Sequence, residues 1–162
     1  MTMPYVYDKP EADKLAGAKA AGQASFDAIR EMVEALQVAA KARDDAEDSP
    51  EGDTDGQAYR AWEYVERTIH EDALTVEVRS GWYSPGARDA DTKPAEYRIL
   101  LSTGGPAVQI VGSLSEHGEP ETAVMQVQDW FLPWTDYHPN NVLHSEYMEI
   151  LLAYARCFYF GE

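Results

Sequence analysis

The strongest constraint on the fold of this chain is a change in the spacing of its apolar residues at Leu74. Before Leu74, apolar side chains recur every three or four positions, which is typical of helices that bury one face. From Leu74 to Val78 they alternate with polar side chains, which is typical of a strand. Short apolar segments divided by turn residues continue as far as residue 128. The sequence therefore predicts an α+β protein in which helices precede a sheet.

Two helices are expected before the sheet. The first begins near Ser25, a residue type favoured at helix N-caps, and ends near Ala42. Residues 1–24 are expected to form a flexible or weakly helical arm, because the glycines within them weaken a helix. The second helix is expected at residues 57–72 and buries the apolar side chains of Ala58, Trp62, Val65 and Ile69.

An acidic segment lies between these helices. Residues 43–56 hold seven carboxylates together with one proline and two glycines, a composition typical of an exposed loop. Two interpretations are open, a solvated linker between helices and a charged finger that contacts a basic partner. Glu63 and Glu66 of the second helix extend the same charge. The seven acids of the segment are Asp44, Asp45, Glu47, Asp48, Glu51, Asp53 and Asp55.

Four strands are expected downstream, with no helix between any two of them. Short turns such as Gly104-Gly105-Pro106 favour an antiparallel meander. The second and third strands carry continuous apolar runs, so they are expected at the centre of the sheet. Residues 129–141 are expected to be irregular, and a last helix at residues 143–160 is expected to pack on one face. Together, residues 25–162 are expected to form a single domain. The strands are expected at residues 74–82, 97–101, 107–111 and 122–128.

The net charge limits the partners of this protein. Its 162 residues include 29 acidic and 13 basic residues, a formal charge of −16 at pH 7. Such a surface repels nucleic acids and anionic lipids, and it attracts basic proteins. We therefore expect no direct binding of nucleic acid and no binding to membranes. The same charge also serves solubility, and the sequence does not determine the oligomeric state.

The cellular location is also indicated by the sequence. A single cysteine, Cys157, cannot form an internal disulfide, which suits a reducing compartment. The first residues lack the basic and apolar regions of a secretory signal. No apolar run approaches the roughly 20 residues that span a bilayer. A cytoplasmic location is therefore expected.

No residue pattern predicts catalysis, so we expect the protein not to be an enzyme and to need no cofactor. The four histidines form no HExxH motif. His138 and His144 could join Asp136 and Glu146 in a metal cluster, but their spacing matches no standard site, and no metal is expected. Cys157 is expected to be a buried thiol, because its neighbours on the last helix are apolar.

The aromatic segment at residues 129–138 is the second candidate for function. It contains Trp130, Trp134 and Tyr137 within eight residues. One interpretation is a hydrophobic lid over an open edge of the sheet. The other is a patch that binds a partner, because tryptophan and tyrosine are enriched in binding hot spots.

The C-terminal part of the chain resembles a largely uncharacterised family of small acidic proteins from bacteriophages, prophages and other mobile elements. The resemblance covers residues 69–162, and the N-terminal helices lie outside it. It implies an origin in mobile DNA and transfers no catalytic residue. The segments that carry the resemblance are IHEDALTVEVRSGW (69–82), PAEYRILL (94–101), TGGPAVQIV (103–111), QDWF (128–131), PWT (133–135) and FYFGE (158–162).

Two functions follow as hypotheses. The first is an inhibitor of a host defence system, of anti-CRISPR or anti-restriction type, that acts by stoichiometric binding. Its acidic surface would imitate DNA and occupy the groove of a basic, nucleic-acid-binding host protein. The alternative is an accessory module of a phage that binds another protein through residues 129–138, without DNA mimicry. Both would place the protein in the cytoplasm of a bacterial host.

Overall fold

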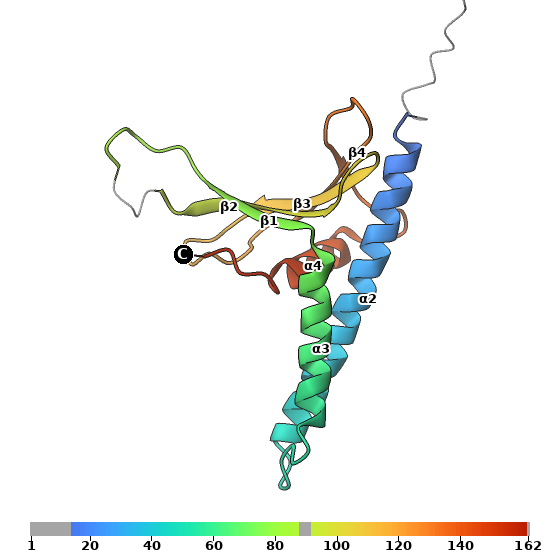
Figure 1. Ribbon diagram of the computed structural model, residues 1–162, viewed down its shortest axis with the longest axis vertical. Coiled ribbons are helices and arrows are strands. Elements are labelled where there is room, and N and C mark those ends of the chain that lie inside the picture. Colours follow the sequence, from blue (N-terminus) through green and yellow to red (C-terminus); the bar gives the residue numbers. More distant parts are fainter. Residues whose placement is uncertain (1–13, 88–91, 162) are drawn as a thin grey trace, which may run out of the picture.

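The computed structural model describes residues 14–87 and 92–161, and it confirms an α+β protein whose helices precede an antiparallel sheet (Figure 1). Within these residues, two α-helices come first, five strands follow, and one α-helix comes last. The elements are α2 (Ala16–Glu47), α3 (Gln57–Asp72), β1 (Thr75–Ser80), β2 (Pro94–Ser102), β3 (Ala107–Ser113), β4 (Val124–Gln128), β5 (Thr135–Tyr137) and α4 (His144–Ala155).

The sheet is a meander in the order β1-β2-β3-β4-β5, and every neighbouring pair of strands is antiparallel. This confirms the expected meander and the central place of β2 and β3. The expected number of four strands was wrong, because β5 forms within the segment that was expected to be irregular. β5 has three residues and lies between Pro133 and Pro139, so it is too short to show an alternating pattern.

One face of the sheet carries the core. Side chains such as Ile99, Ile110 and Met125 point from this face toward α2 and α4, which supply Phe26 and Leu151 among others. The helices α2, α3 and α4 lie on this side of the sheet in Figure 1, so α4 packs on one face as expected. The opposite face carries mainly polar side chains around an open concavity of about 670 Å³.

A buried hydroxyl ties α4 to the last two strands. The Tyr147 hydroxyl accepts a hydrogen bond from the Met125 N–H at 2.8 Å. It also donates to the Tyr137 carbonyl at 3.0 Å. Burial raises the pKa of this hydroxyl, so it stays protonated and able to donate. The contact fixes the position of β5 relative to α4.

The first helix begins earlier and ends later than expected. α2 starts at Ala16 instead of Ser25 and continues to Glu47 instead of ending near Ala42. Residues 1–13 of the expected arm lie outside the described residues. Tertiary packing outweighs the low helix propensity of glycine here, because Gly22 lets the backbone approach the sheet. A Cβ at Gly22 would lie 2.7 Å from Val127 Cγ1.

α2 and α3 form a long hairpin that extends away from the sheet (Figure 1). The buried residues of α2 all lie between Ala18 and Val33, and the one buried residue of α3 is Ile69. The expected buried stripe on α3 was therefore wrong in part. The distal half of the hairpin packs only on itself, so its other three stripe residues, Ala58, Trp62 and Val65, are half-buried.

The last helix is shorter than expected, since it ends at Ala155 instead of residue 160. The chain then continues in irregular form, and Phe160 packs on Tyr97 with a distance of 4.7 Å between the ring centroids. Residues 156–160 were expected on the helix because Phe158 continues the apolar stripe of Tyr147, Leu151 and Tyr154. In the part of the chain that the structure describes, no helix has the length and apolarity needed to cross a membrane.

Candidate functional site: the acidic hairpin tip

The seven predicted acids gather at the far end of the α2–α3 hairpin. The expected loop at residues 43–56 was wrong in its first part, because residues 43–47 form the last turn of α2. The remaining residues turn the chain back into α3 through Gly52 and Gly56, which both adopt positive φ angles that suit glycine. All the acids of this segment are exposed except Asp53, which is half-buried.

Three of these acids are already engaged within the hairpin. Asp44 pairs with Arg43 at 2.8 Å, and Asp45 pairs with Lys41 at 2.6 Å. The hydrogen bond from Lys41 to Asp45 raises the pKa of the lysine, which therefore remains charged. Asp53 accepts hydrogen bonds from the backbone N–H groups of Gln57 and Tyr59, so it caps the start of α3.

Four acids remain without a hydrogen bond or an ion pair among the described residues. They are Glu47, Asp48, Glu51 and Asp55. All four are exposed. Because no contact within the protein has to be broken first, these carboxylates can pair with a cation of another molecule at the smallest cost in free energy. We call them the free tip acids.

Aromatic packing braces the hairpin just above the tip. The Arg43 guanidinium lies 4.6 Å from the centroid of the Trp62 ring, a cation–π contact between α2 and α3. Trp62 also packs on Tyr59 with 5.7 Å between the ring centroids. The Arg43 contact joins the two helices where the core does not reach, and Tyr59 supports the Trp62 ring from within α3.

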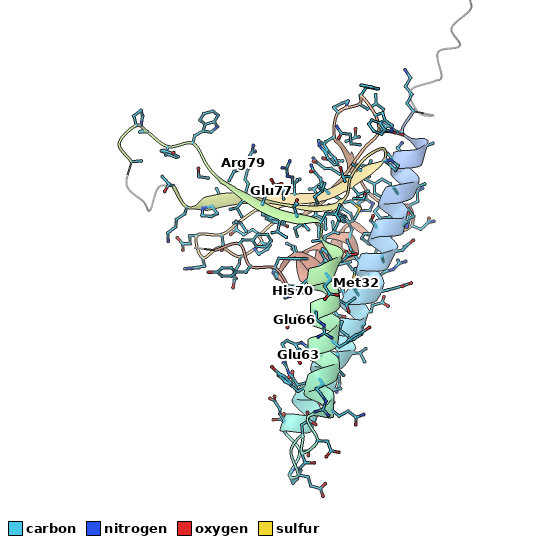
Figure 2. The ribbon with its side chains drawn as sticks, viewed as in Figure 1. Met32, Glu63, Glu66, His70, Glu77 and Arg79 are labelled. Atoms are coloured by element: carbon cyan, nitrogen blue, oxygen red, sulfur yellow. The ribbon has the colours of Figure 1, made fainter. Side chains whose placement is uncertain are left out.

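The two acids predicted on α3 lie above the tip (Figure 2). Glu63 is exposed, whereas Glu66 is half-buried. The charge of Glu66 is one of the causes that raise the pKa of the Cys157 thiol, so this side chain lies toward the body of the protein. Glu63 extends the acidic surface, but Glu66 does not belong to the tip.

One side of the hairpin is apolar. A shallow groove of about 530 Å³ is lined by Ala35, Val38, Ala39 and Ala42, with Glu31 and Glu34 beside them. Val38 is largely exposed. A partner that receives the hairpin would therefore meet an acidic tip and a small apolar flank.

The aromatic candidates lie at the opposite end of the molecule, on the β4–β5 connection (Figure 1). Trp130 is 65% exposed, and its ring lies over the turn at Gly105. Trp134 is half-buried. Phe131 lies within the predicted aromatic segment but was not among its predicted contacts, yet it is fully exposed and adopts a φ of 64°, which is unusual for a bulky residue. The sequence showed its position but not its exposure.

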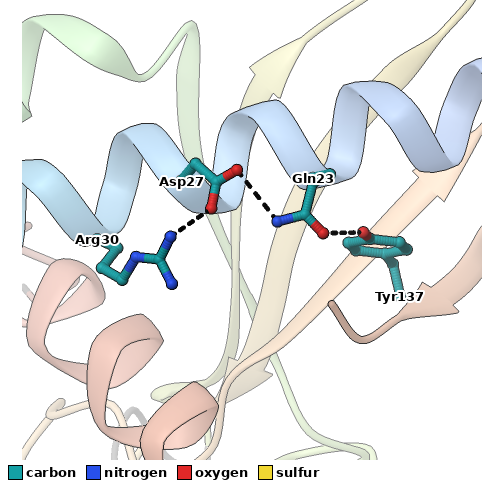
Figure 3. Close-up of polar contacts among 4 residues, drawn as sticks. All are labelled: Gln23, Asp27, Arg30 and Tyr137. Atoms are coloured by element: carbon teal, nitrogen blue, oxygen red, sulfur yellow. Dashed lines mark hydrogen bonds and ion pairs between the residues drawn. The ribbon is translucent and has the colours of Figure 1, made fainter. Parts of the chain in front are cut away.

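Tyr137 is half-buried and has a structural role (Figure 3). Its hydroxyl donates to Gln23 Oε1 at 2.9 Å, and Gln23 Nε2 donates to Asp27 at 3.1 Å. Asp27 pairs in turn with Arg30 at 2.7 Å. This chain of polar contacts attaches β5 to α2. The acidic and aromatic candidates are therefore separate surfaces, and Tyr137 belongs to the packing of the second.

The histidines and the cysteine that could carry chemistry do not form a site among the described residues. His138 and His144 stack with 5.9 Å between their ring centroids, but the described residues include no group of three or more side chains able to hold a metal. Cys157 is half-buried instead of fully buried, and its thiol donates to the Ala153 carbonyl. Burial raises the pKa of this thiol to about 11.

Comparison with known proteins adds no relative. No protein-family model, no curated protein and no solved structure matches this chain.

Proposed function

We propose that this protein inhibits a basic, nucleic-acid-binding protein by inserting its acidic hairpin tip into the groove that holds the nucleic acid. The observation that carries the proposal is the set of four free tip acids at the end of a projecting hairpin. Among the described residues, Glu47, Asp48, Glu51 and Asp55 form no ion pair with a base, although the charge of Glu47, after the hydrogen bond to Asp44, helps to raise the pKa of Arg43. Their charge is available to a partner. The resemblance to proteins of mobile elements favours a host defence protein as the target.

The charge density of the hairpin supports the proposal. Between Glu34 and Glu66 the chain holds 10 acidic and 3 basic residues, a net charge of −7. The distal part of α2, residues 34–47, is about 21 Å long at 1.5 Å per residue. Because the turn at residues 48–56 adds to this length, the density is below about one net charge per 3 Å, at most comparable to that of a single DNA strand. A groove built for DNA would therefore attract the hairpin.

The test uses two variants that carry the same change in net charge. The tip variant combines Glu47→Gln, Asp48→Asn, Glu51→Gln and Asp55→Asn and keeps Asp44, Asp45 and the cap Asp53. The control variant neutralises four exposed acids of the body, Glu116→Gln, Glu119→Gln, Glu121→Gln and Glu149→Gln. Each variant changes the formal net charge from −16 to −12.

The assay measures displacement of fluorescent duplex DNA from purified restriction enzymes and CRISPR effector complexes by fluorescence anisotropy. We expect the parent protein to displace DNA from a susceptible target, less so as salt rises, because exposed charges are screened. The tip variant should associate about tenfold more slowly, since steering by charge sets the on-rate. The control variant should keep the parent affinity. Absence of displacement, or equal losses in both variants, would refute the proposal.

The exposed aromatic turn supports a second candidate function, a module that binds a protein through Trp130 and Phe131. The specific observation is that Phe131 is fully exposed in a conformation that costs free energy. The same panel separates the two functions. Loss of binding in Phe131→Ala, together with full binding in the tip variant, would favour the aromatic module.

A further inference from the structure

Strand β1 is an edge of the sheet, and its outer side pairs with no strand in the described residues. Five of its six residues are exposed, from Thr75 to Arg79. Val76 and Val78 are among them, and Leu74, just before the strand, also keeps a large exposed surface. An exposed apolar edge strand is a template on which another strand can pair.

The pairing of β1 with β2 assigns each side chain to a face of the sheet, because directly opposed residues share a face. Val76 lies opposite Ile99 and Val78 opposite Tyr97, so both valines are on the helix side. Glu77 lies opposite Arg98 and therefore points to the open side. Arg79 lies opposite Glu96 on that same side. Figure 2 shows Glu77 and Arg79 together on this strand.

Each of these charges already has a partner on β2. Arg98 Nη2 lies 2.5 Å from Glu77 Oε2. Arg79 forms an ion pair with Glu96. β1 and β2 together hold two acids and two bases, whereas the whole chain carries −16. The edge is therefore locally neutral, so a second copy can approach it without the repulsion that the rest of the surface would cause.

We propose that two copies of this chain associate through their β1 edges, antiparallel, with Val78 of one copy opposite Val78 of the other. This register places Glu77 of each copy opposite Arg79 of its partner copy. On the open side, the charged side chains then form a row across the seam whose charges alternate in sign. The row runs from Arg98 and Glu77 of one copy to Arg79 and Glu96 of the other. On the helix side, the two Val78 side chains meet.

The neighbouring registers are excluded by charge. A two-fold axis perpendicular to the sheet keeps each face on its own side, so residues can shift only in steps that preserve the faces. A pairing centred on Glu77 sets the two Glu77 carboxylates directly opposite each other. A pairing centred on Arg79 does the same with two guanidinium groups. Like charges directly opposite are destabilising, so the pairing centred on Val78 is the favoured one.

Two charge reversals test the register, Arg79→Glu and Glu77→Arg. Each variant alone brings like charges together across the seam, twice in each dimer. A mixture of the two variants restores opposite charges at both positions. The loss of the ion pairs within each chain is the same in the mixture as in the separate variants, so each variant is its own control for folding. Circular dichroism checks that both remain folded.

Native mass spectrometry and sedimentation velocity measure the association. An edge contact is smaller than a standard interface of about 1,600 Å², so we expect a parent dimer in the micromolar range. Each reversal should weaken the homodimer at least about tenfold, because opposed like charges cost more than about 1.4 kcal/mol. The mixture should form the heterodimer, whose mass differs from both homodimers. A parent protein that stays monomeric up to about 500 μM, far above a micromolar constant, would overturn the proposal. So would a mixture that associates no better than its components.

Discussion

The close approach of α2 to the sheet predicts opposite outcomes for one substitution at two positions of the same helix. Gly22→Ala adds a methyl group that would lie 2.7 Å from Val127 Cγ1 and 2.9 Å from Tyr137 Cδ1. Val127 is buried, so it has little room to move. Overpacking of a buried site costs about 1–3 kcal/mol, and the gain in helix propensity over glycine is about 1 kcal/mol. We expect a net loss of up to about 2 kcal/mol.

Gly17→Ala is the matched control. The added Cβ would lie 3.7 Å from Asp129 Oδ2, an ordinary van der Waals distance, and Gly17 is exposed. The gain in helix propensity is then unopposed, so we expect a stabilisation of up to about 1 kcal/mol. The gain should fall toward the lower end because Gly17 lies in the first turn of α2.

Urea denaturation followed by circular dichroism measures both variants against the parent protein. The midpoint should fall for Gly22→Ala and rise for Gly17→Ala, with the same dependence on urea concentration. For a chain of this length, each 1 kcal/mol corresponds to a shift of about 2–4 °C in Tm. If both substitutions stabilise the protein, α2 does not pack on β4 and β5 as described, and the reasoning from the Gly22 distances is wrong.

Three further predictions concern single side chains. Tyr147→Phe should cost about 1–3 kcal/mol, because it leaves the buried Met125 N–H without its acceptor, whereas Tyr159→Phe at an exposed position should change stability little. The Cys157 thiol, whose pKa is raised to about 11, should react slowly with thiol reagents at pH 8 in the folded protein and quickly in urea. Because folding favours its protonated form, its contribution to stability is complete below about pH 9 and is lost as the pH rises toward 11. Asp53→Ala should remove the cap of α3 and lower the urea midpoint by an amount equivalent to about 1 kcal/mol.

Local patterns predicted the parts of the fold that depend on neighbours in the sequence. The helix expected at residues 57–72 coincides with α3, because its apolar spacing and the flanking Gly56 are strong local signals. The meander was predicted because alternating segments with short turns can pair only with their neighbours. Element ends were less accurate. The start of α2 depends on how Gly22 packs on Val127, and no local pattern contains that contact.

In the candidate site, too, the sequence predicts some features and only the tertiary structure decides the others. The cluster of carboxylates at residues 43–56 was visible in the sequence, but their different roles were not. Asp53 is a helix cap and Asp44 is paired with Arg43, whereas Glu47 and Asp48 remain free. These roles depend on distances of a few ångströms between side chains. Composition gives the total charge of a segment, but only the folded structure decides which of its carboxylates are paired within the protein.

The sequence by itself determined the order of the helices and of the first four strands, the −16 charge and the alternation of side chains along β1. These properties are local or additive, so they need no knowledge of distant residues. The tertiary structure decided what covers each face. The same alternation buries Ile99 on β2 and leaves Val76 exposed on β1, although the two lie opposite each other. The physical reason is that burial depends on which elements pack nearby, and at the edge of this sheet no described element covers the outer strand.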